Sequence, residues 1–175
     1  MARMLLIALA LVAAILAGPA VAQTPPDAAE LAAYRGLHAA AASGDVAAIR
    51  KLAGAGDALN VRDGNGRTPL HVAAFRGQAE AIRALIAAGA DPGLLDNQRY
   101  DAVTIVSVTD DVPALMALLA SGASAKLTTS RYDGTALIAA AHLGHDGIVR
   151  ELIKAGAPLD HVNNLGWTAL IEAVI

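Results

Sequence analysis

Cysteine is absent from the 175 residues of the chain, and aromatic side chains make up only 3% of them. Without a thiol the chain has no disulfide, no cysteine nucleophile and no thiolate ligand for a metal. Its hydrophobic fraction of 55% is therefore mostly alanine and aliphatic residues. Small apolar side chains let helices approach closely, so this composition favours a thin stack of helices over a thick globular core.

Positive charge is also scarce. The chain has 13 Lys and Arg against 16 Asp and Glu, a net charge of -3, and its only lysines are Lys51, Lys126 and Lys154. Proteins that bind nucleic acids carry clustered basic residues. We therefore expect no nucleic-acid partner.

Catalytic motifs are missing as well. Neither G-x-S-x-G nor H-E-x-x-H occurs, and the glycines Gly64 and Gly66 are not followed by the Gly-Lys-Ser/Thr of a phosphate loop. Asp110 and Asp111 are adjacent carboxylates at the start of an expected helix, where a cap and dipole partner explains them better than acid–base catalysis. The sequence thus predicts neither an enzyme nor a cofactor.

A metal site has little support. His142 and His145 have a spacing that can place two imidazoles on one metal ion. The spacing fixes no third ligand, and Asp146 and His161 are candidates by composition alone. We expect no metal.

The first 22 residues are typical of a secretory signal. Arg3 precedes an uninterrupted apolar run over residues 5–17, which is too short to span a bilayer comfortably. Gly18-Pro19 ends the run, and Ala20-Val21-Ala22 has the small-x-small pattern of a cleavage site. The sequence predicts a cleavable signal peptide over residues 1–22, with an uncleaved N-terminal anchor as the alternative.

This segment predicts that the protein is periplasmic or secreted, in a Gram-negative bacterium, with no membrane association after cleavage. Residues 23–27 are expected to be a short linker that Pro25-Pro26 keeps extended. Asp27 and Glu30 resemble a capping box, so a helix is expected from Ala28 to about Ala42.

A repeated unit organises the rest, and Thr68–Asp91 is its clearest copy. Thr68 and Pro69 suit a helix start, Gly77 ends a first short helix, and Gly89 suits the end of a second one. The equivalent glycines at 56, 89, 122 and 156 are 33, 33 and 34 residues apart. Such a helix pair cannot bury its own apolar faces and needs copies of itself on both sides.

Two copies depart from the pattern. The third has Asp101-Ala102-Val103-Thr104 in place of Thr68-Pro69-Leu70-His71 and Asp110 in place of the loop glycine, and one residue is inserted before Thr135. We therefore expect the stack to be less regular over residues 96–134. The fifth starts at Asn163 and stops at Ile175, inside its first helix, which predicts a fragment or a truncated product.

The segments TPLHVAAFRG…LIAAGAD, TALIAAAHLGHDGIVRELIKAGA and GDVAAIRKLAGAGDALN resemble ankyrin repeats. The resemblance implies an all-α solenoid of helix-turn-helix units with short β-hairpin fingers, covering residues 28–175 as about four complete repeats and a truncated fifth. It also implies a binding scaffold without catalytic machinery, a protein partner and a monomer. In this family the histidine of the TPLH-type turn, here His38 and His71, ties adjacent units through the backbone.

The repeat register places a set of aromatic, basic and apolar residues on the concave face that ankyrin proteins use for partners. Aromatic and arginine side chains are favoured at binding hot spots. The alternative for Tyr100 and Trp167 is that they cover neighbouring fingers and stabilise the stack, and this structural role is favoured for Tyr34. The expected partner-binding residues are Arg67, Phe75, Arg76, Tyr100, Tyr132, His142, Leu143 and Trp167.

Three functions stay open at this point. The first is a non-catalytic protein–protein interaction scaffold in the cell envelope. The second is a regulator of a periplasmic enzyme, whether inhibitor, immunity-type factor or activator. The third is an enzyme whose active site lies beyond residue 175.

Overall fold

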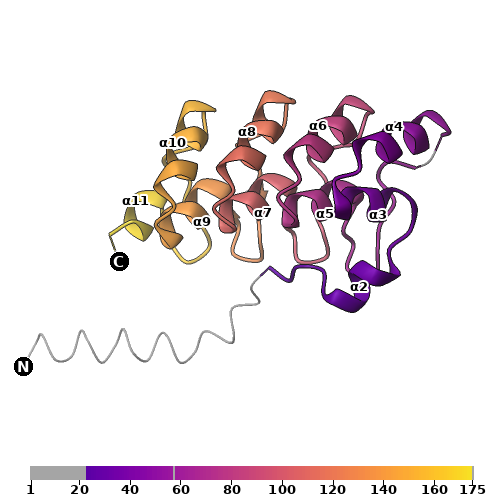
Figure 1. Cartoon of the computed structure of the whole chain (residues 1–175). Coiled ribbons are helices and arrows are strands. Elements are labelled where there is room, and N and C mark those ends of the chain that lie inside the picture. The colour runs from indigo at the N-terminus through magenta and orange to yellow at the C-terminus, as the bar shows by residue number, and fades with distance from the viewer. Residues whose placement is uncertain (1–22, 57, 175) are drawn as a thin grey trace, which may run out of the picture.

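The computed structural model describes residues 23–56 and 58–174, so the predicted signal segment lies outside the described residues. The described chain is a single row of helix pairs with loops projecting from one side (Figure 1). The inner helices are α3 (Gly36–Ser43), α5 (Pro69–Phe75), α7 (Ala102–Val108), α9 (Ala136–Leu143) and α11 (Ala169–Glu172). The outer helices are α4 (Val46–Gly54), α6 (Ala79–Ala87), α8 (Val112–Ala120) and α10 (Asp146–Lys154).

The core is a strip that runs the length of this row. Each inner helix packs on the next inner helix, and each outer helix on the next outer one. The aliphatic columns fill the strip, and Ile82, Leu85, Leu115 and Leu118 are fully buried. Burying one such side chain is worth about 1.5–3 kcal/mol. The predicted all-α stack of helix-turn-helix units is confirmed.

Local chemistry sets the helix boundaries. Thr68, Asp101 and Thr135 each accept a hydrogen bond from the backbone three residues later, at the starts of α5, α7 and α9. Gly77 follows α5 with φ of +64°, and a Cβ there would lie 2.5 Å from the carboxylate of Asp111. The positive φ and the close approach of the Asp111 side chain both favour glycine at that position.

The third unit keeps this geometry without the glycine. Asp110 takes the same left-handed conformation with φ of +57°. Asp tolerates that region better than most other residues. Asp111 then caps α8, accepting from the amide of Ala114 at 2.9 Å, and Pro113 falls in the first turn. Helices α7 and α8 therefore have the same 7 and 9 residues as α5 and α6.

The single helix expected from Ala28 to about Ala42 is wrong. The chain forms α2 (Ala28–Ala33), breaks at Tyr34 with ψ of 144°, and resumes as α3. The predicted capping box of Asp27 and Glu30 is present. Contacts with the following finger explain the break, because the Tyr34 hydroxyl donates to Asp63 at 2.7 Å. Helix α2 accordingly lies on the finger side of the row (Figure 1).

Two buried histidines link neighbouring units, as the resemblance predicts. His38 Nε2 lies 2.9 Å from the carbonyl oxygen of Arg67, and His71 Nε2 lies 3.0 Å from that of Tyr100. The amide of Thr68 donates to His71 Nδ1 at 3.1 Å. His71 Nδ1 is therefore the acceptor and Nε2 carries the proton, which requires a neutral ring.

No helix among the described residues has both the length and the apolar content that a bilayer crossing requires.

The His71 ring generates a pH-dependent prediction. Its burial lowers its pKa below the ordinary 6.5, so the unfolded chain takes up the proton at a higher pH than the folded chain does. The stability that depends on a neutral His71 is thus complete above about pH 6.5 and is lost as the pH falls toward the folded pKa. Between pH 7.5 and 5.5, urea unfolding should show a loss on the order of 1 kcal/mol that His71→Gln lacks. Equal pH slopes for the two proteins would contradict the assignment.

Candidate protein-binding face

Three of the four described fingers are each framed by one polar side chain. Asp63 Oδ1 accepts from the amides of Asn65 and Arg67, both at 2.9 Å. Asp96 does the same for the amides two and four residues later, also at 2.9 Å, and Asn163 does so at 3.0 Å. This pattern closes a tight turn with the side chain in place of backbone. Only the finger before α9 adds a two-residue ladder in the described chain, β1 (Thr128–Thr129) with β2 (Gly134–Thr135).

Backbone hydrogen bonds join each finger to the next. The amide of Asn97 donates to Asn65 at 3.0 Å, that of Ser130 to Arg99 at 2.7 Å, and that of Asn164 to Tyr132 at 2.9 Å. The finger tips therefore form one continuous hydrogen-bonded row. A surface ordered in this way loses little conformational entropy when a partner binds.

Tyr100 lies at the centre of that row and is half-buried against the core. His71 holds its carbonyl oxygen, and Asp96 holds its amide. Burial raises the pKa of its hydroxyl. A hollow of about 130 Å³ lies beside it, between Asn97, Gln98, Arg99, Tyr100 and Arg131. Tyr100 thus contributes to stacking and also lines an open hollow.

The assignment of Arg67 to the binding face requires correction. Its side chain is only 1% exposed and makes ion pairs with Glu30 and Asp63. Burial opposes ionisation of Asp63, but the hydrogen bonds from Tyr34 and Arg67 outweigh it and lower the pKa of Asp63. Burial similarly works against the charge on Arg67, and its hydrogen bonds to Asp63 and Glu30 raise its pKa. Arg67 therefore joins α2 to the first finger, and its guanidinium is occupied by Glu30, Asp63 and the carbonyl oxygen of Thr24.

Phe75 and Arg76 lie at the far end of α5 from the fingers. Phe75 is half-buried against the core, whereas Arg76 is exposed at the helix end. One inner helix of 7 residues, roughly 10 Å long, separates this pair from the finger row. Tyr132 sits in the finger row itself and is half-buried.

The remaining expected residues belong to the last described units. Leu143 is 45% exposed and Trp167 36% exposed. His142 follows the core part of α9, and its Nδ1 lies 2.8 Å from Glu172 of α11. The structure thus spreads the eight expected residues along the row without bringing them into one pocket.

His142 and His145, the two histidines considered as possible metal ligands, have separate partners. His142 contacts Glu172, whereas His145 Nδ1 lies 2.9 Å from the carbonyl oxygen of Ser107. Among the residues that the structure describes, no group of three or more His, Cys, Asp or Glu is arranged to hold a metal ion.

Sequence reasoning missed Gln98 and Arg131. Both line the hollow beside Tyr100, and Arg131 has no ion pair within the described chain. Both lie in the fingers, and their residue types are common in exposed turns. Only the packing of one finger on the next shows that they share a hollow.

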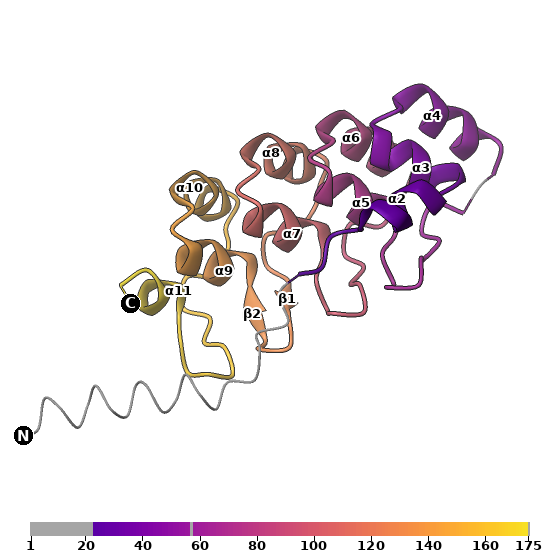
Figure 2. The same cartoon turned by 60° about the horizontal axis from the view of Figure 1, so that its bottom comes forward.

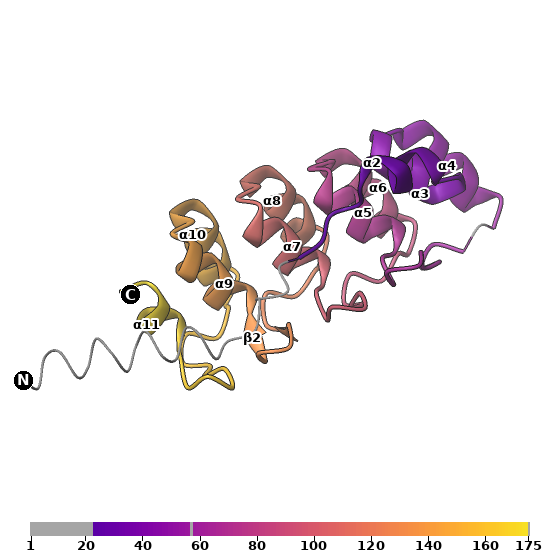
Figure 3. The same cartoon turned by 90° about the horizontal axis from the view of Figure 1, so that it is seen from below.

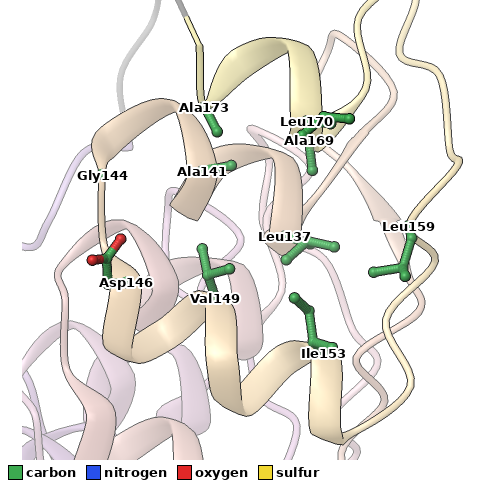
Figure 4. A pocket seen from close by; sticks show the side chains of 10 residues that line it. All are labelled: Leu137, Ala141, Gly144, Asp146, Val149, Ile153, Leu159, Ala169, Leu170 and Ala173. Carbon is green, nitrogen blue, oxygen red and sulfur yellow. The ribbon is translucent and has the colours of Figure 1, made fainter.

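A larger apolar hollow of about 410 Å³ lies at the last described pair, between α9, α10 and α11 (Figure 4). Leu137, Val149 and Ile153 point into it, with Leu170 and Ala173 on the α11 side. Leu115 and Ile82 are the equivalents of Val149 in earlier units, and there the next outer helix covers them. The hollow is thus an uncovered stacking surface, unlike the polar hollow beside Tyr100.

The buried position of Arg67 predicts a structural phenotype. Arg67→Ala leaves two carboxylates without their cation, and we expect it to lower the free energy of unfolding by about 2–4 kcal/mol. Arg83→Ala is the matched control, because Arg83 is 46% exposed and its partner Glu80 is 77% exposed, so its loss should cost at most about 1 kcal/mol. Urea unfolding measures both. Similar small losses would show that the buried ion pairs contribute little.

Comparison with known proteins agrees with this architecture. A family model described as ankyrin repeats (3 copies) matches residues 37–128 and 104–175. No protein of established function matches the chain in a search of the curated proteins. The family match covers most of the chain, and the helix pairs, fingers and histidine ties fit it. The chain therefore belongs to the ankyrin-repeat family.

Proposed function

We propose that this protein is a non-catalytic protein–protein interaction scaffold of the cell envelope, which binds its partner on the concave face formed by the fingers and inner helices. Ankyrin repeats generally mediate protein–protein interactions and are typically non-catalytic. The single observation that carries the proposal is the continuous hydrogen-bonded finger row. It presents Tyr100, Tyr132 and Trp167 on one rigid support.

The proposed binding surface combines the kinds of side chain that dominate protein interfaces. Trp167 and Leu143 offer exposed apolar area, and Arg76 and Arg131 offer exposed guanidinium groups. Tryptophan, tyrosine and arginine are enriched among residues whose truncation weakens binding most. Their fixed backbone positions favour recognition of one partner in one orientation.

The location of the scaffold rests on the signal-like residues 1–22. The charged start, short apolar run and small-x-small end support export and removal of the segment. A periplasmic or secreted scaffold needs no disulfide when stacking supplies its core, and the cysteine-free composition is compatible with that address.

Affinity capture from a periplasmic extract, with mass spectrometry of the bound proteins, tests the proposal. Arg76→Glu and Trp167→Ala should each reduce capture of the main partner at least about tenfold, while the melting temperature changes by no more than about 2 °C. Arg50→Glu is the control, because it makes the same charge reversal at an exposed position of outer helix α4. Unchanged capture by both test variants, or equal losses with Arg50→Glu, would contradict the concave face as the binding surface.

A further inference from the structure

The segment over residues 23–27, expected to be a plain linker, lies against the finger row. From the start of α2 it runs back across α5 toward α7 in two different views (Figures 2 and 3). Pro26 is buried, although Pro25 and Asp27 on either side of it are exposed. The segment therefore occupies part of the concave face that the proposed function assigns to a partner.

Three hydrogen bonds hold Thr24 to residues of two different fingers. The amide of Thr24 donates to Gln98 Oε1 at 3.1 Å, and Gln98 Nε2 donates to the Thr24 hydroxyl at 3.2 Å. Arg67 Nη1 donates to the Thr24 carbonyl oxygen at 3.2 Å. The amide and the carbonyl oxygen of Thr24 are thus both hydrogen-bonded, which is the way an extended peptide is bound.

The two prolines suit this mode of binding. Proline fixes φ near -65° and favours the extended polyproline conformation, so a Pro-Pro segment loses little entropy when it docks. The side chain of Gln98 that binds Thr24 also lines the hollow with Tyr100 and Arg131. The residues that bind Thr24 therefore adjoin an open hollow, with the cation of Arg131 at its edge.

We infer that Gln98, Arg67 and the adjoining hollow form a site for an extended proline-containing peptide, and that residues 23–27 are its intramolecular occupant. The inference rests on the proposed function and names the kind of partner segment that the face accepts. A partner must displace residues 23–27 to bind there. Because a tethered segment has an effective concentration in the millimolar range, it excludes weak competitors and admits stronger ones.

The test measures the fluorescence anisotropy of a labelled peptide with the sequence of residues 23–30, titrated with the full-length chain. Pro25→Ser with Pro26→Ser releases the resident segment, and the peptide should then bind at least tenfold more tightly than to the unaltered chain. Adding Gln98→Ala to that variant should reverse the gain. A control peptide with alanine in place of both prolines should bind at least tenfold more weakly.

A second measurement keeps the inference testable if the serine variant is unstable. The chain has no cysteine, so Thr24→Cys with Gln98→Cys introduces the only two thiols. Thr24 is hydrogen-bonded to the amide end of Gln98, so the shorter cysteine side chains lie within reach of a short thiol crosslinker. Dibromobimane should bridge the two thiols, each thiolate displacing one bromide. Thr24→Cys paired with Met116→Cys, on outer helix α8, is the control and should not be bridged within one chain. Failure of dibromobimane to bridge the first pair would overturn the placement of the segment.

The outcomes separate this inference from the proposed function. Equal peptide affinity for the unaltered chain and the serine variant, or no effect of Gln98→Ala, would overturn the inference even if Arg76→Glu and Trp167→Ala reduced partner capture. A proline-dependent gain that Gln98→Ala reverses would support it even if those two variants captured the partner normally.

Discussion

Stacking of one helix pair on the next is the constraint from which the rest of the structure follows. Within a pair such as α5 and α6, each helix covers only part of the other's apolar surface. The pair therefore leaves one apolar face open on each side. Ile82 and Leu85 are fully buried because the adjacent pairs cover them, and alanines such as Ala81 and Ala114 let the helices come close enough to do so. The core is therefore a strip of repeated local contacts, which is the arrangement typical of solenoid proteins.

This arrangement also orders the fingers. A loop alone would not keep Tyr100 in place, but the stack brings His71 of the preceding unit under its carbonyl oxygen. Asp96 then closes the turn, and the amides of Asn97 and Ser130 connect the finger to both neighbours. Order in the binding face is thus a consequence of core packing, and it extends to residues 23–27 through Gln98 and Arg67.

Much of this could be predicted because the repeat register converts one-dimensional spacing into spatial position. The glycine spacing and the Thr68-Pro69 helix start identified the pairs, and the His38 and His71 ties followed from the family resemblance. The conformation at Asp110 could not be predicted from its residue type. The third unit keeps its shape because this non-glycine residue takes a positive φ.

The failures share one physical cause. Arg67 was placed on the binding face because its repeat column looks toward the concave face in ankyrin proteins, yet it is buried by α2, which has no counterpart in the other units. The break at Tyr34 and the position of residues 23–27 arise from the same long-range contacts of the N-terminal segment with the fingers. Periodicity carries no information about an element that occurs once.

Amide hydrogen exchange tests most directly whether stacking orders the binding face. The informative amides are those of Asn97, Ser130 and Asn164, which donate from one finger to the next. They should exchange as slowly as amides of the inner helices and lose protection at the same denaturant concentration, because both depend on the same stack. Exchange of these three amides at the rate of an unstructured chain, while the helices stay protected, would contradict the account.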